Sequence, residues 1–189
     1  ARTIAFTAGE RVDPEAAAGL PFPVSPPLDA VEYGDAIESL LALYPRYCHL
    51  ANLNLLGSHD TDRVLTVAGD DVESVVLSTL LNFTFPGSPS IYYGDEIGMS
   101  GGNDPGSRGA FPWKRTDLWN DRLLEAHRSL ISLRKEHRVL RHGKYRRLPV
   151  ENGSSLYAFA VEDDEELLLI AVNVSDLGAS ATVAGEELS

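Results

Sequence analysis

The chain has 189 residues, 43% of them hydrophobic and 23% charged, which is the composition of an ordinary globular protein. The formal net charge is −12, and this argues against a nucleic-acid partner, whose phosphates need clustered Lys and Arg. Cys48 is the only cysteine, so an intrachain disulfide and a thiolate metal cluster are both excluded. No apolar run approaches the ~20 residues of a membrane span, so we expect no membrane partner.

The N-terminal region is predicted to hold two helices joined by an irregular segment. Residues 1–9 have the pattern of a helix tail, which Gly9 would stop. Five prolines between residues 14 and 27 predict a long irregular connection, because proline interrupts regular elements. Apolar side chains at helical spacing then predict a helix over residues 28–44, and Pro45 closes the pattern.

The middle of the chain has the order strand, helix, strand. The short apolar run at residues 50–57 predicts a buried strand, and the spacing of apolar residues over 70–82 predicts a helix. A second buried strand is predicted at residues 90–94, after a turn rich in proline and glycine. This order is typical of a β-α-β unit with parallel strands, so the predicted fold class is α/β.

The C-terminal region changes from helical to strand patterns. Residues 121–138 predict a strong helix, because their leucines and isoleucine lie on one side of it. Residues 156–161 and 167–174 then predict two strands joined by an acidic turn, with no further helix. We therefore expect two domains, an α/β part at residues 1–138 and a separate antiparallel β module at residues 139–189.

Charged residues follow both strands of the predicted β-α-β unit. His59 and Asp60 come after the first strand, and Asp95 and Glu96 come after the second. Because parallel α/β folds build their sites at the carboxyl ends of strands, these residues indicate one shared cleft. By residue type alone, Asp60 and Glu96 fit the paired carboxylates of a glycosidase, but either pair could equally serve to bind nearby backbone groups.

The glycine-rich loop at residues 98–109 matches no common ligand-binding loop. A phosphate cradle needs its glycines to open a helix, usually with a lysine, and this loop has neither. Calcium needs several oxygen ligands at alternate positions, whereas only Asn103 and Asp104 offer them. We expect no cofactor and no metal in this chain. The acidic run at residues 162–166 is interpreted as a solvated turn.

Two stretches resemble motifs of the α-amylase superfamily. Residues 54–63, with the sequence Asn-Leu-Leu-Gly-Ser-His-Asp-Thr-Asp-Arg, are similar to the motif at the end of the seventh strand of its (β/α)8 barrel. Residues 85–99, which include Ile-Tyr-Tyr-Gly-Asp-Glu-Ile-Gly-Met, are similar to its eighth-strand motif. The continuation at residues 102–105, with Arg108 and Trp113, narrows the resemblance to the neopullulanase, maltogenic amylase and cyclomaltodextrinase branch.

The resemblance covers about residues 28–175 and implies the C-terminal part of a (β/α)8 TIM barrel followed by the start of an antiparallel β-sandwich domain. It also implies a retaining glycoside hydrolase of α-glucans such as cyclodextrin, pullulan or starch oligosaccharides, with an α-glucan oligosaccharide as the partner. Asp60 matches the third catalytic carboxylate, which stabilises the transition state. The residues that match sugar-binding positions of the family are His59, Arg63, Asp104 and Arg108.

Two catalytic groups of the family have no counterpart in this sequence. The resemblance places the nucleophilic Asp in a Gly-x-Arg-x-Asp pattern after the fourth strand, and the acid, a Glu, after the fifth. The only Arg-x-Asp triplets here, at residues 11–13 and 115–117, stand in the wrong context. We expect the chain to be an enzyme fragment that is inactive by itself. The alternative is a free-standing carbohydrate-binding or interaction module.

Two further expectations concern what lies beyond the chain. A calcium site is compatible with the resemblance in the part of the enzyme that this sequence does not include. A partial barrel leaves strand edges unpaired, and unpaired edges invite association with other chains. We therefore expect self-association through exposed strand edges.

Overall fold

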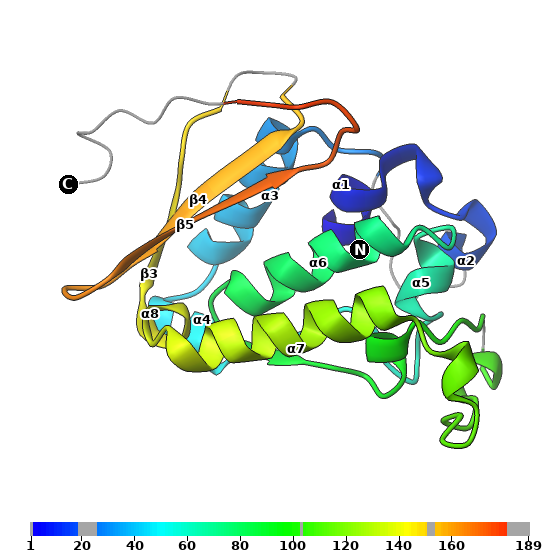
Figure 1. Cartoon of the computed structure of the whole chain (residues 1–189). Helices are drawn as coiled ribbons and strands as arrows, with labels where there is room; N and C mark the ends of the chain where they lie inside the picture. The colour runs from blue at the N-terminus through cyan, green and yellow to red at the C-terminus, as the bar shows by residue number, and fades with distance from the viewer. Residues whose placement is uncertain (1, 19–25, 103, 151–153, 181–189) are drawn as a thin grey trace.

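The computed structural model describes residues 2–18, 26–102, 104–150 and 154–180 (Figure 1). None of the helices in these ranges is long and apolar enough to cross a membrane. The elements, in chain order, are α1 (Arg2–Ala8), η1 (Gly9–Arg11), α2 (Pro14–Ala18), α3 (Ala30–Ala42), α4 (Arg46–Ala51), β1 (Leu53–Leu55), α5 (Val64–Val67), α6 (Val72–Thr84), β2 (Ser88–Ser90), η2 (Asp95–Ile97), η3 (Gly106–Arg108), η4 (Thr116–Leu118), α7 (Asp121–Glu136), α8 (Val139–His142), β3 (Lys144–Arg147), β4 (Leu156–Glu162) and β5 (Leu167–Asn173), where η marks a 3-10 helix.

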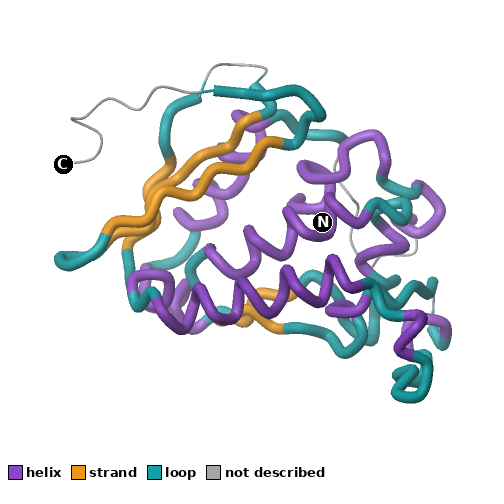
Figure 2. Tube along the Cα trace, viewed as in Figure 1, coloured by secondary structure: helices purple, strands orange, loops and turns teal. Residues whose placement is uncertain are grey.

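The predicted β-α-β unit is confirmed. β1 and β2 pair in parallel, with Leu53 opposite Ser88 and Leu55 opposite Ser90. α6 lies between them in the chain and runs beside α7, while the two short strands lie behind α7 in the view of Figure 2. Both strands differ from the prediction: the first is shorter, and the second begins two residues earlier and shares only Ser90 with the predicted range 90–94. α4 occupies the start of the first, and the second ends at Ser90 because the chain then turns, with Gly94 in the left-handed region at φ 89°.

Side-chain caps define where the three longest helices begin. Asp29 Oδ1 accepts hydrogen bonds from the Val31 and Glu32 amides, both at 2.8 Å, at the start of α3. Asp71 caps α6 in the same way, and Asn120 caps α7. The predicted helices at residues 28–44, 70–82 and 121–138 are thereby confirmed with shifts of at most two residues at each end.

Besides α4, three short helices correct the sequence-based prediction. α2 lies in the segment predicted to be irregular, because Pro14 takes the first helical position, where no N–H is needed, and Asp13 Oδ1 accepts from the Glu15 amide at 2.8 Å. Residues 19–25 of that segment lie outside the described residues. α5 was not predicted, and α8 contradicts the expectation of no helix after residue 138. Each spans four residues, too few to show a helical period.

The C-terminal strands form an antiparallel sheet in the order β3, β4, β5. β4 and β5 were predicted, and in their connecting turn Asp163 Oδ1 accepts from the Glu166 amide at 2.9 Å. The sheet lies beside α3 (Figure 1). Aromatic side chains pack it against α1 and α3. Phe6 stacks on Tyr33 with 4.4 Å between ring centres, and Tyr157 meets Tyr33 edge-on at 5.0 Å. The sheet and the helical part therefore share one hydrophobic core.

Candidate functional site

The loop after β1 presents His59 and Asp60 to solvent. Their side chains are 63% and 67% exposed, and Nε2 of His59 lies 3.2 Å from Oδ1 of Asp60. The Asp60 amide donates to the Ser58 hydroxyl at 3.2 Å, and the Ser58 amide donates to the Thr61 hydroxyl at 3.1 Å. These local hydrogen bonds fold the loop so that a carboxylate and an imidazole lie side by side at the carboxyl end of a strand.

The loop after β2 brings Asp104 and Arg108 to the same place. Arg108 Nε lies 3.2 Å from Asp104 Oδ1 and donates to the His59 carbonyl at 3.2 Å. Its Nη2 is 3.8 Å from Asp60 Oδ1. The buried Ser107 adds a hydrogen bond from its hydroxyl to the His59 carbonyl at 3.4 Å. The structure thus gathers four of the five predicted site residues into one exposed cluster of two acids, one histidine and one arginine.

Arg63 is placed differently from the prediction that it lines the sugar cleft. Its side chain has no exposed surface, and Nη1 lies 3.1 Å from Asp95 Oδ1. The guanidinium carbon is 4.4 Å from the ring centre of Tyr92 and 4.7 Å from that of Tyr93. Arg63 is buried because a carboxylate and two aromatic faces replace water around its charge. In this arrangement its guanidinium is held by Asp95 and the two tyrosines and has no exposed surface.

The carboxylates of Asp95 and Glu96 both contact other groups of the chain. Burial raises the pKa of Asp95 to about 6, although the hydrogen bond and charge of Arg63 act in the opposite direction. Glu96 Oε2 accepts a hydrogen bond from the Gly94 amide at 2.6 Å, across its own turn. Glu96 therefore binds a backbone group, as the alternative explanation expected, whereas Asp95 pairs with the side chain of Arg63. The sequence marked Asp95 as a strand-end charge, but it contained no signal for the partner, which lies 32 residues away.

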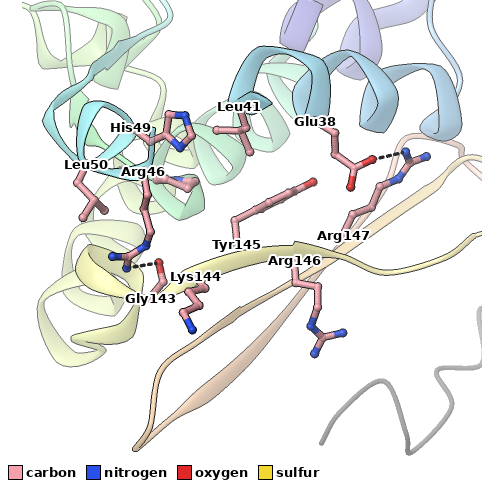
Figure 3. Close-up of a pocket in the computed structure, with 11 residues that line it drawn as sticks. Glu38, Leu41, Arg46, His49, Leu50, Gly143, Lys144, Tyr145, Arg146 and Arg147 are labelled. Atoms are coloured by element: carbon pink, nitrogen blue, oxygen red, sulfur yellow. Dashed lines mark hydrogen bonds and ion pairs between the residues drawn. The ribbon is translucent and has the colours of Figure 1, made fainter. Parts of the chain in front are cut away.

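A pocket lies at the other end of β1 and β2 and is separate from the exposed cluster. Figure 3 shows this pocket of about 440 Å³ between α3, α4 and β3. Its lining residues Leu50 and Pro86 come before β1 and β2, so it lies at their amino ends. Arg147 in its wall is paired with Glu38 at 3.2 Å, and Arg46 donates to the Gly143 carbonyl at 3.3 Å. These charges are engaged in holding the wall together.

The fold and the exposed cluster have the arrangement of a segment of a TIM barrel. Parallel strands joined by a helix end in an acid, a histidine and an arginine, which is where this architecture builds its sites. The family model described as "Alpha amylase, catalytic domain" matches residues 27–118. The chain belongs to the α-amylase family, as its two motifs indicated. The continuation into a β-sandwich domain stays a prediction.

Several known proteins are similar to this chain over most of its length. A cyclomaltodextrinase of Geobacillus thermopakistaniensis is 43% identical over 166 residues, which is 88% of this chain and 28% of the relative. Neopullulanase 2 of Thermoactinomyces vulgaris is 37% identical over 75% of this chain and 24% of its own length. The solved native form of the Nostoc punctiforme debranching enzyme is 47% identical with a TM-score of 0.89, covering 96% of this chain and 37% of that one. The chain therefore spans between 24% and 37% of the length of these relatives.

Proposed function

We propose that this chain is the part of a retaining α-glucan hydrolase that supplies the transition-state-stabilising carboxylate, Asp60, and a set of sugar-binding residues. The observation that carries the proposal is the exposed cluster, in which Asp60 lies within 3.2 Å of His59 and 3.8 Å of Arg108. The names of the relatives, cyclomaltodextrinase and neopullulanase, support α-glucan oligosaccharides as the substrate class.

The chemistry of the cluster suits a glycosidase. Retaining glycosidases pass through an oxocarbenium-like transition state, and hydrogen bonds to the sugar that tighten at this point lower the barrier. An exposed carboxylate with an imidazole and a guanidinium beside it offers an acceptor and donors to sugar hydroxyls. Arg63 then takes part through the position of the loop, in place of the direct contact that the resemblance implied.

The proposal requires the nucleophile and the general acid from residues outside this chain, because neither motif occurs in the sequence. We expect the isolated chain to show no turnover of cyclodextrin, pullulan or a nitrophenyl maltoside, because the covalent intermediate cannot form without a nucleophile. Reducing-sugar and nitrophenol release measure this directly. Robust turnover by the purified chain would contradict the proposal.

The positive test is a chimera, in which residues 1–189 replace the matching segment of the Nostoc punctiforme debranching enzyme, to which they are 47% identical. We expect the chimera to hydrolyse α-glucan oligosaccharides that the parent enzyme hydrolyses. The unmodified parent, purified and assayed in parallel, is the control. A chimera that is folded by circular dichroism and yet inactive would count against the proposed function.

The charged pair of the second loop gives a binding prediction. Asp104→Ala and Arg108→Ala should each raise the KM of the chimera about 10-fold to 100-fold, because hydrogen bonds to charged groups contribute about 1.5–3 kcal/mol. Arg115→Ala is the matched control, since Arg115 forms a comparable exposed pair with Asp117 at 2.7 Å. Initial-rate kinetics with a maltooligosaccharide measure the KM of each variant. An unchanged KM in both variants would remove these residues from the binding site.

Self-association is proposed for the isolated chain, with a second copy as the partner. β1 has β2 on one side and no strand on the other among the described residues, and its Leu53 and Leu55 are 64% and 50% exposed. Leu53→Lys should therefore shift the chain toward monomer in sedimentation velocity, because a charge on an edge strand opposes pairing. Leu118→Lys, at a 58% exposed leucine of η4 that belongs to neither sheet, is the control. A parent chain that is monomeric at all concentrations would contradict the proposal.

A further inference from the structure

The loop at residues 57–63 carries Asp60, the exposed carboxylate of the proposed site. The buried side chain of Asp95 contacts both ends of this loop. At its far end, Arg63 Nη1 lies 3.1 Å from Asp95 Oδ1. At its near end, a Cβ added to Gly57 would lie 2.2 Å from the other oxygen of the same carboxylate, Asp95 Oδ2. The Asp95 carboxylate therefore touches both ends of the loop that presents Asp60.

The guanidinium of Arg63 is held in one place from several directions. Nη1 also donates to the Tyr93 carbonyl, and the Arg63 amide donates to the Gly101 carbonyl at 2.9 Å. Nε and Nη2 are buried without a hydrogen-bond acceptor among the described residues, and the group lies over the rings of Tyr92 and Tyr93. These contacts join the end of the β1 loop to the β2 loop in a buried setting, with side chains only 0% and 7% exposed, where an ion pair is screened little.

Asp60 has no comparable support of its own. Its partners, His59 at 3.2 Å and Arg108 at 3.8 Å, have side chains that are 63% and 45% exposed. Exposed ion pairs contribute little energy and adapt to several geometries, so they cannot by themselves hold a carboxylate in one orientation. The position of Asp60 therefore depends on the backbone of its loop, and hence on the anchors at the two ends of that loop.

We infer that Asp95 and Arg63 are positioning residues, which set the orientation of Asp60 by clamping the loop at residues 57–63 against the loop after β2. The inference rests on the proposed function, because it assigns the pair a part in the same reaction. It predicts that disturbing the clamp lowers the rate of the chemical step more than substrate binding. Misplacing a reacting group by about 1 Å can reduce a rate on the order of 10²-fold.

The test uses two variants that disturb the clamp in different ways. Asp95→Asn removes the charge and keeps the shape, whereas Gly57→Ala keeps the charge and pushes the carboxylate away. In the chimera with the Nostoc punctiforme enzyme, both should lower kcat on the order of 10²-fold while KM changes less than about threefold. Asp117→Asn, which removes an exposed carboxylate paired with Arg115, is the control and should leave both constants unchanged.

A second readout uses the chain of 189 residues itself and needs no activity. In amide NMR spectra, Asp95→Asn and Gly57→Ala should shift the signals of Ser58 and Asp60, and Asp117→Asn should leave them in place. If the parent chimera is inactive, the proposed function fails, and these shifts still decide whether the clamp positions the loop. If Asp95→Asn does not fold, Gly57→Ala carries both measurements. Unshifted signals, an unchanged kcat in folded variants, or a rise in KM alone would overturn the inference.

Discussion

Replacing Asp60 by asparagine should lower kcat/KM of the chimera about 10³-fold. The proposed role of the carboxylate is to interact with the sugar more strongly in the transition state than in the ground state. Losing several kcal/mol of that interaction slows the reaction by this factor. The change keeps the size of the side chain and removes its charge. Initial rates on a maltooligosaccharide, together with a binding measurement on the same variant, separate the two states. We expect substrate binding to change far less than kcat.

Two controls define this prediction. Asp117→Asn removes an exposed carboxylate that also pairs with an arginine, at 2.7 Å, and should leave kcat/KM unchanged. Circular dichroism of Asp60→Asn should match that of the parent, because the side chain is 67% exposed and supports no core contact. If the folded variant retained the parental kcat/KM, Asp60 would not be the transition-state-stabilising carboxylate, and the proposed function would lose its main residue.

Arg63→Met should lower the free energy of unfolding of the chain by about 3 kcal/mol at pH 8, because removing one partner of a buried ion pair leaves the other charge uncompensated. The side chain of Arg63 has no exposed surface, and that of its partner Asp95 is only 7% exposed. Methionine occupies much of the same space, so the cavity contribution is small. Urea unfolding followed by circular dichroism gives the value, and Arg122→Met, which breaks an exposed pair with Glu73, should change it by less than about 1 kcal/mol.

The pH dependence of that loss has a definite sign. Burial raises the pKa of Asp95 from 3.8 to about 6, so the folded chain keeps this carboxyl group protonated up to a higher pH than the unfolded chain does. The stabilisation linked to this group is complete below pH 3.8 and disappears as the pH rises through about 6. Without Arg63 the pKa rises further, and protonation then relieves the uncompensated charge. The loss in Arg63→Met should therefore be smaller at pH 5 than at pH 8, and an equal loss at both would contradict the role of Asp95.

The sequence by itself determined the helices that have caps and a full apolar period, and the order of the β-α-β unit. Asp29, Asp71 and Asn120 stand where three helices begin, and capping depends on hydrogen bonds within a few residues, so local sequence is sufficient. The motif around His59 and Asp60 identified the family, because its residues are contiguous in the chain. The helices α5 and α8 were not predicted because four residues are too few to show a helical spacing of apolar side chains.

Only the tertiary structure decided which of the predicted charged residues are exposed to solvent and which lie beneath the surface. Arg63 and Arg108 were both predicted to bind substrate, yet the side chain of Arg108 is 45% exposed and that of Arg63 is fully buried. The difference arises from Asp95, 32 residues away in the chain, whose carboxylate and neighbouring aromatic rings replace water around one arginine. Burial of a charge depends on partners brought together by folding, and the spacing of residues along the chain does not encode it.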